Sequence, residues 1–145
     1  MNLVIKKFDE LTNTELYELL KARFEVFVVE QNCVYQDMDD TDYDSLHIFC
    51  EQDKKVIAYL RMFPKKDDAD TLQIGRVLTV NHGRGLGAKI MEQAIKVAKD
   101  STSATKIYLE GQTYCTGFYE KFGFKVISDE FILDGIPHVK MQLKL

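Results

Sequence analysis

The chain has 145 residues, of which 46% are hydrophobic and 29% charged, which predicts one globular domain over residues 1–145. The net charge of −4, without a Lys/Arg run, favours cationic partners over nucleic acid, and no apolar stretch is long enough to span a membrane. The three cysteines have no metal-ligand spacing, and no signal-peptide pattern follows the first residue. We therefore expect no metal, reduced thiols and a cytoplasmic location.

The first half of the chain alternates between strand and helix signals. A strand is expected at residues 3–8, followed by a helix that begins at Thr12 or Thr14 and keeps helical apolar spacing to Phe27. After a polar, acid-rich segment, the pattern predicts a hairpin and a further strand, at residues 47–50, 55–62 and about 72–80.

The acid-rich segment has two interpretations. It contains five aspartates, which are Asp37, Asp39, Asp40, Asp42 and Asp44. They could form an anionic rim that attracts a cationic amine, or they could belong to a solvated loop. The second interpretation is the more common one for such a run of charge.

A glycine-rich turn separates the first half of the chain from the second. It reads Gly83-Arg84-Gly85-Leu86-Gly87-Ala88 and is followed by a helical pattern at residues 90–98 and a strand at 106–109. This strand–turn–helix–strand order predicts two parallel strands. A short helix at 117–122 and strands at 124–127 and 139–143 complete the expected elements. Together they predict a mixed α/β sheet with helices on both faces.

The glycine-rich turn could be a plain strand-to-helix turn without a ligand, or it could belong to one of three kinds of nucleotide-binding site. Glycines and the start of a helix suit a pyrophosphate. The chain has no GxxxxGK[ST] motif, which disfavours an ATP-type loop. A Rossmann dinucleotide site needs an acid after the next strand, where Glu110 lies, but little chain follows. Coenzyme A needs only one such loop.

Four ordered segments, spread over nearly the whole chain, resemble the GNAT superfamily of acyltransferases and, within it, the ElaA-like subgroup. Arg23–Gln31 is similar to the subgroup's RxxVFVVEQ segment, and Ile74–Val77 to the entry of the family's central strand. Gly117–Phe124 resembles the superfamily motif FYxxxGF, and Asp134–His138 the subgroup's DGIPH turn. The resemblance implies the GNAT fold, a mixed α/β (α+β) fold. Its central sheet is mostly antiparallel with one splayed parallel pair of strands, and helices cover both faces.

The resemblance also implies the cofactor and the roles of several residues. Acetyl-CoA would be the co-substrate, and Tyr119 would protonate the departing thiolate. The pantetheine arm would bind along the central strand, at Val77, Leu78 and Thr79. The pyrophosphate would bind in the glycine turn, at Gly83, Arg84, Gly85, Leu86, Gly87 and Ala88. The turn is about two residues shorter than the family pattern, so either His82 or Arg84 could occupy the basic position.

The general base is not provided by the resemblance. Several GNAT enzymes use a glutamate on the central strand, but residues 71–80 contain no acid. Glu30 is the first substitute, with His47, His138 and ordered water as alternatives. Cys115 could accept an acyl group but has no evident adjacent base.

The sequence therefore predicts transfer of an acetyl group from acetyl-CoA to a primary amine on a small molecule or a peptide. Two other interpretations stay open: a non-catalytic acetyl-CoA-binding module and a Rossmann oxidoreductase. No membrane partner is expected, and a homodimer is left open.

Overall fold

The computed structural model describes residues 1–80 and 84–145. Within them the chain forms one eight-stranded sheet in the order β1-β2-β3-β4-β5-β8-β6, with β7 paired to β8. The strands are β1 (Asn2–Lys7), β2 (Leu46–Gln52), β3 (Lys55–Pro64), β4 (Thr71–Thr79), β5 (Lys106–Gln112), β6 (Lys125–Val126), β7 (Phe131–Leu133) and β8 (Ile136–Lys144). The strand β7 was not predicted, because three residues are too few for a recognisable alternation.

In the part of the chain that the structure describes, three α-helices, three short 3-10 helices and one π-helix connect the strands. They are α1 (Asn13–Arg23), α2 (Leu86–Ser101), α3 (Thr116–Glu120), η1 (Phe8–Glu10), η2 (Phe24–Glu30), η3 (Thr41–Asp44) and η4 (Thr113–Cys115). Thr12 caps α1 and forms a capping box with Glu15, as the sequence predicts. Among the described residues, no helix combines the length and apolarity that a membrane crossing needs.

The predicted first helix changes character at Phe24. From that residue to Glu30 it continues as the π-helical η2. Bonding from i to i+5 changes the number of residues per turn, so the α-helical spacing no longer fixes which side chains face the core. Phe24, which the spacing assigned to the apolar face, is 54% exposed.

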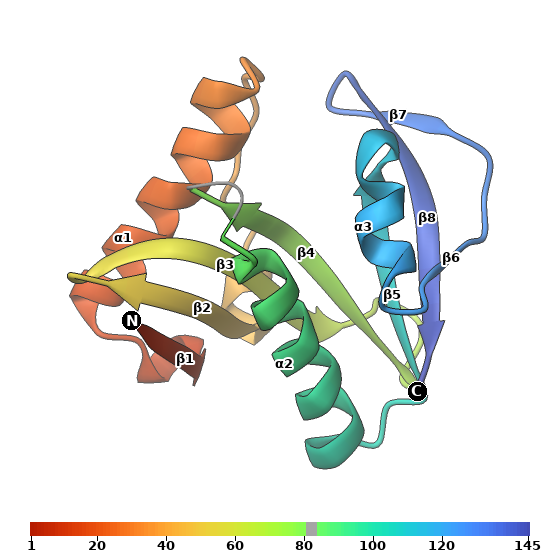
Figure 1. Cartoon of the computed structure of the whole chain (residues 1–145), viewed down its shortest axis with the longest axis horizontal. Coiled ribbons are helices and arrows are strands. Elements are labelled where there is room, and N and C mark those ends of the chain that lie inside the picture. Colours follow the sequence, from red (N-terminus) through yellow and green to blue (C-terminus); the bar gives the residue numbers. More distant parts are fainter. Residues whose placement is uncertain (81–83) are drawn as a thin grey trace.

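Helices cover both faces of the sheet, as predicted. The helices α2 and α3 lie on one face and α1 on the other (Figure 1). The first face buries a cluster that includes Ile90 and Met91 of α2 and Ile107 of β5. The second buries a smaller cluster in which Leu19 of α1 packs near Phe49 and Tyr59. Burial of these apolar side chains drives the assembly of the three layers.

Strand direction excludes one interpretation of the glycine turn. The pair β4 and β5 is parallel, whereas the other pairs among the described strands are antiparallel. A Rossmann sheet requires several consecutive parallel strands. The dinucleotide site with Glu110 as its acid is therefore wrong.

Candidate active site

The two strands at the centre of the sheet separate after four residue pairs. Their parallel pairing joins Thr71–Ile74 to Lys106–Leu109 and then ends. On its other side, β4 pairs Gly75 with Arg61 and Leu78 with Tyr59, so β4 contains one extra residue there. Such a β-bulge bends the strand that carries it. As a result β4 and β5 diverge like the arms of a V (Figure 1).

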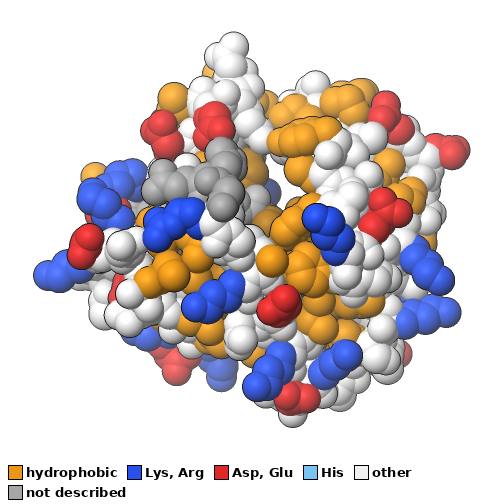
Figure 2. Space-filling view, viewed as in Figure 1, with side chains coloured by type: hydrophobic (Ala, Val, Ile, Leu, Met, Phe, Trp, Pro, Cys, Tyr) orange, Lys and Arg blue, Asp and Glu red, His pale blue; other side chains and the backbone are white. Residues whose placement is uncertain are grey.

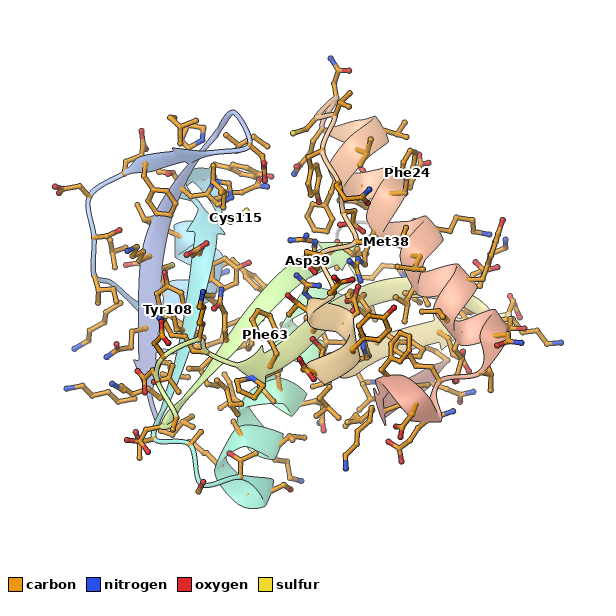
Figure 3. All side chains as sticks on the ribbon, turned by 180° about the vertical axis from the view of Figure 1, so that it is seen from behind. Phe24, Met38, Asp39, Phe63, Tyr108 and Cys115 are labelled. Carbon is orange, nitrogen blue, oxygen red and sulfur yellow. The ribbon has the colours of Figure 1, made fainter. Side chains whose placement is uncertain are left out.

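A cleft of about 620 Å³ opens between the diverging strands. We call its two sides the β4 wall, formed by η2, the segment 31–44, β3 and β4, and the β5 wall, formed by β5, η4, α3 and the β7–β8 hairpin. Figure 2 shows the surface hollowed between these two halves of the molecule. In Figure 3, Asp39 lies on the β4 side and Cys115 on the β5 side. Its size and concavity are those of a small-molecule site.

Part of the predicted cofactor site lines this cleft. Val77, Leu78, Thr79 and Gly87 are among the lining residues. Residues 84, 85, 86 and 88 are not: Arg84 and Gly85 are exposed, Leu86 is buried in the core and Ala88 is half-buried. Gly83 and His82 lie outside the described residues, so the choice between His82 and Arg84 stays a prediction.

The start of α2 suits an anion. Gly85 precedes the helix with a φ of 70°, in the left-handed region that favours glycine, and offers no side-chain cap. The N–H groups of the first helical turn therefore keep their positive partial charge for a ligand.

Tyr119 reaches the cleft from α3. Its side chain is 8% exposed and packs edge-on against Phe118 and Phe124, with ring centroids 5.2 and 6.1 Å away. The ring lies directly against β5 at Gly111, where an added Cβ would come within 3.1 Å of a Tyr119 ring carbon. Burial raises the pKa of Tyr119 above its usual range, so the phenol keeps its proton at neutral pH. A neutral phenol facing the cleft can act as a proton donor.

Of the three candidate bases, Glu30 and His138 line the cleft and His47 does not. His47 is 0% exposed; its Nδ1 lies 2.7 Å from the Tyr59 hydroxyl and its Nε2 lies 3.0 Å from the Asp42 carbonyl. Burial lowers the pKa of His47. A neutral, fully paired imidazole at this position serves packing and does not reach a ligand in the cleft.

Six charged side chains under the β4 wall form a closed ring of ion pairs, which we call the ion-pair ring. In order around the ring they are Arg23, Asp37, Arg76, Asp39, Arg61 and Asp42. Successive N–O distances are 2.9 Å (Arg23–Asp37), 2.8 Å (Asp37–Arg76), 3.6 Å (Arg76–Asp39), 2.7 Å (Asp39–Arg61), 3.0 Å (Arg61–Asp42) and 2.7 Å (Asp42–Arg23).

The ring ties the acid-rich segment to the bulge of β4. Arg76 occupies the bulge with a φ of 55°, a left-handed conformation that costs a non-glycine residue energy. Its guanidinium also donates to the Asp37 carbonyl at 3.0 Å and lies over the Tyr35 ring. These contacts hold the backbone in the conformation that separates β4 from β5.

Both sequence interpretations of the acidic segment are wrong for three of its aspartates. Asp37 and Asp42 are buried and, with Asp39, they are paired to arginines, so they form neither a free anionic rim nor a solvated loop. Burial alone would raise the pKa of Asp42, but Arg23 and Arg61 outweigh it and hold the pKa below its ordinary value.

Contacts at the rim join the walls across the cleft, and two of them are hydrogen bonds between side chains or from side chain to backbone. The side-chain amides of Gln31 and Gln112 lie 3.3 Å apart, and the Cys33 thiol donates to the Asp134 carbonyl at 3.1 Å. Both contacts connect the segment after η2 to the far end of the C-terminal half. They define the rim of the cleft on the side remote from the β4–β5 junction.

Cys115 lines the cleft near Tyr119, but its chemistry is that of a thiol. Burial raises the pKa of Cys115, and a hydrogen bond with Tyr114 only partly offsets this. The nucleophilic form of cysteine is the thiolate. The acyl-accepting role considered for Cys115 therefore loses support.

Sequence reasoning missed the ion-pair ring, and it considered Glu110 only as the acid of a dinucleotide site and not as a carboxylate of this cleft. A signal for the ring exists in Arg23, a charged residue on the apolar face of the first helix, since a buried charge requires partners. The cleft position of Glu110 depends on the register of β4 against β5, which one sequence does not reveal.

Comparison with known proteins identifies the family. The sequence matches the family described as "Acetyltransferase (GNAT) domain" over residues 9–145. The chain belongs to the GNAT acetyltransferases. It is also similar to the Escherichia coli protein ElaA, 37% identical over 91% of this chain and 89% of that protein.

Two solved structures share the fold of this GNAT chain closely. One is an acyl-CoA N-acyltransferase from Pseudomonas aeruginosa, with a TM-score of 0.90, 36% identity and coverage of 98% and 99% of the two chains. The other is E. coli ElaA, with a TM-score of 0.90, 33% identity and 97% coverage of both. The predicted ElaA-like subgroup and the GNAT fold with one parallel pair are confirmed.

Proposed function

We propose that the protein transfers the acetyl group of acetyl-CoA to a primary amine of a cationic acceptor. The observation that carries the proposal is the cleft between β4 and β5, in which Tyr119 lies opposite the bulged strand. The similar P. aeruginosa protein is an acyl-CoA N-acyltransferase by name, which supports an acyl-CoA donor here.

The shape of the cleft fits such a donor. Beyond Ile74 the described pairing of β4 with β5 ends, so the backbone of Val77–Thr79 on the cleft side can hydrogen-bond the amides of a pantetheine arm. Gly87 lies near the start of α2, where the helix N-terminus suits a pyrophosphate. The donor would thus extend from the helix start to the junction of the two strands.

The residues of the site supply the chemistry that acetyl transfer needs. A backbone N–H of the splayed strand can stabilise the oxyanion that develops on the thioester carbonyl. Tyr119 can donate its proton to the leaving sulfur, since burial keeps the phenol protonated. Neither function requires a group from outside the cleft.

Charge favours a cationic acceptor. Three carboxylates line the cleft, those of Glu30, Glu110 and Asp134. The lining arginines, Arg61 and Arg76, have their charges neutralised within the ion-pair ring. An ammonium group entering the cleft therefore meets a net negative potential.

The three cysteines, Cys33, Cys50 and Cys115, are free thiols, which supports the cytoplasmic location that we propose.

The acceptor can be a small molecule or a peptide, and a homodimer stays a prediction.

Thermal unfolding with acetyl-CoA, CoA, NAD and ATP tests the donor. We expect stabilisation by acetyl-CoA and CoA alone, by ~2.7 kcal/mol at a hundredfold excess over Kd. Release of free CoA thiol with amines then tests catalysis. A thermal shift without thiol release for any amine would indicate a non-catalytic acetyl-CoA-binding module.

Tyr119→Phe tests the proton donor. We expect turnover to fall at least ~100-fold with an unchanged acetyl-CoA thermal shift, since Tyr119 acts on the leaving group. Unchanged turnover would remove Tyr119 from the mechanism.

A further inference from the structure

The central strand lacks the acid that several GNAT enzymes place there. Residues 71–80 contain neither Asp nor Glu. The neighbouring strand, however, contains a glutamate at the point where the two strands separate. The last parallel pair is Ile74 with Leu109, and the next residues along the two strands are Gly75 and Glu110. Glu110 therefore begins the β5 wall at the base of the V.

The side chain of Glu110 points away from the face that carries α2 and α3. Leu109 and Ile107 alternate with it and are buried in the cluster under α2. On its own face the Tyr108 hydroxyl donates to Glu110 Oε2 at 2.8 Å. Figure 3 shows Tyr108 on β5 and Phe63 on β3 from this side of the sheet. Glu110 is exposed and lines the cleft.

Adjacent residues of β5 thus present two chemical groups on opposite faces. Glu110 supplies a carboxylate on one face, and Gly111 receives the Tyr119 ring on the other. A thioester held between β4 and β5 would have the proton donor on one side and the carboxylate on the other. An amine adds to one face of the thioester carbonyl, whereas the leaving sulfur lies in the plane of that carbonyl, so a base beside the amine and an acid beside the sulfur act from different directions.

Gly75 leaves room for the amine opposite Glu110. A Cβ added at Gly75 would approach the rings and chains around it no closer than 3.8 Å, to Phe63. A group of that size would therefore be in ordinary van der Waals contact with the Phe63 ring and with the guanidinium of Arg61, 3.9 Å away, so a small group fits beside Gly75 without displacing them. Phe63 and Glu110 both line the cleft that the acceptor would enter.

We propose that Glu110 binds the ammonium group of the acceptor and takes its proton, a role that rests on the acetyl transfer proposed above. The ammonium gives one proton to the Glu110 carboxylate, and the neutral amine then attacks the thioester carbonyl. A C–N bond forms and the C–S bond breaks. Tyr119 gives its proton to sulfur, and the second proton lost by nitrogen replaces it. Glu110 returns its proton to water, so one proton is released for each amide formed.

Several charged or titratable groups face Glu110. Tyr108 lies on the same strand as Glu110 and donates a hydrogen bond to it. Lys140 of β8 is paired directly opposite Glu110, and His138 is the next residue of β8 on the same face. On the β4 side the group is Arg61, whose charge the ion-pair ring neutralises.

His138 is less suited to the role. Its Nδ1 lies 2.7 Å from the Ile136 carbonyl, which ties the ring to the first residue of β8. Glu30 belongs to η2, on the opposite wall. Both residues serve as rival bases in the experiment below.

The test compares Glu110→Gln with Glu92→Gln, a matched change at an exposed glutamate of α2. CoA thiol release is measured with putrescine, a short diamine, as the probe, and acetyl-CoA binding by thermal shift. We expect Glu110→Gln to lower kcat/KM for putrescine at least ~100-fold while the acetyl-CoA shift is retained. The acidic limb of the kcat/KM profile should flatten. Glu110→Asp should restore part of the rate, and Glu92→Gln should match the wild type.

Other outcomes would overturn either the role of Glu110 or the proposed function on which it rests. A rate that falls in Glu30→Gln or His138→Asn but not in Glu110→Gln would assign the base elsewhere. No turnover of putrescine by the wild type, with a retained acetyl-CoA shift, would overturn the role of Glu110 toward short cationic amines. Loss of the acetyl-CoA shift in the wild type would instead overturn the proposed function itself.

Discussion

The two walls of the cleft are stabilised by different means. Under the β4 wall, the ion-pair ring joins charged residues from α1, β3, β4 and the segment 31–44. Behind the β5 wall, aromatic rings pack edge-on, with Phe118 in contact with both Tyr119 and Phe122. One wall depends on directional, charged contacts and the other on shape and apolar burial.

The difference follows from the backbone that each wall has to hold. The β4 wall contains a bulge with Arg76 in a left-handed conformation, which needs specific partners to persist. The β5 strand is regular, and its ladder with β8 runs from Lys106 to Gln112. Close packing of apolar side chains against β5 is enough to hold Tyr119 in place. Charged contacts therefore accompany the irregular strand, and packing accompanies the regular one.

Removing a central arginine should give the largest effect. Arg23 is 0% exposed and pairs with both Asp37 and Asp42. Arg23→Met would leave two buried carboxylates short of a partner, and we expect the free energy of unfolding to fall by ~3–5 kcal/mol. Lys21→Met removes an exposed ion pair with Glu18 and is the control, with no measurable change expected, because water screens exposed charges. Urea unfolding measures the free energy of unfolding of both variants. Equal losses would contradict the role of the ion-pair ring in stabilising the β4 wall.

Overfilling the β5 wall should have a smaller effect. In Gly111→Ala the new methyl group would meet the Tyr119 ring at 3.1 Å and a Leu109 methyl at 3.2 Å. We expect a loss of ~1–3 kcal/mol in the free energy of unfolding and a lower turnover, because Tyr119 shifts. Gly117→Ala, where no atom lies within 4 Å, is the control and should be neutral or slightly stabilising. A Gly111→Ala protein as stable as the control would show that the ring yields without cost.

Acid should weaken the β4 wall first. The folded-state pKa values of Asp39 and Asp42 are depressed: burial opposes this, but the paired arginines outweigh it. Their contribution to stability is present above the unfolded pKa of ~3.9 and is lost as pH falls through the folded values. We expect the backbone NMR signals of residues 37–44 to shift below about pH 4 before those of β5 and β8 do. Simultaneous change in both regions would argue against separate means of stabilisation.

The contact across the rim should matter least for stability. Gln112→Ala removes the hydrogen bond to Gln31, and we expect the free energy of unfolding to fall by no more than ~1 kcal/mol. Hydrogen exchange should increase near Gln31 and in the β7–β8 turn, since a contact between the walls is lost. A loss comparable to that of Arg23→Met would mean that the rim, and not the ion-pair ring, holds the β4 wall.

Much of the fold could be predicted from local patterns. The Thr12 cap, the helix that follows Gly85 and the hairpin turn at residues 52–54 all depend on residues close together in the sequence, and the structure contains each of them. The π-helical η2 could not be predicted, because the same apolar residues fit an α-helix. The exposed position of Phe24 is the result.

The site was less accessible to sequence reasoning. Tyr119 could be placed from its motif, and it lines the cleft. His47 was considered a base because a histidine can titrate near neutral pH, yet its burial depends on Tyr59 and Asp42, which meet it only in the folded chain. Glu110 and the ion-pair ring likewise depend on strand register and long-range pairing.

The closed form of the ion-pair ring has a consequence for how relatives of this protein diverge. Each of its members contacts two others, so a change at one position leaves two opposite charges with one partner fewer. Single losses should therefore be selected against, and the six positions should be inherited or replaced as a group. Aligned relatives should show correlated change at positions 23, 37, 39, 42, 61 and 76. Lineages that have lost the ring should carry a different residue at position 76, with glycine favoured because it accepts the left-handed backbone without charged partners.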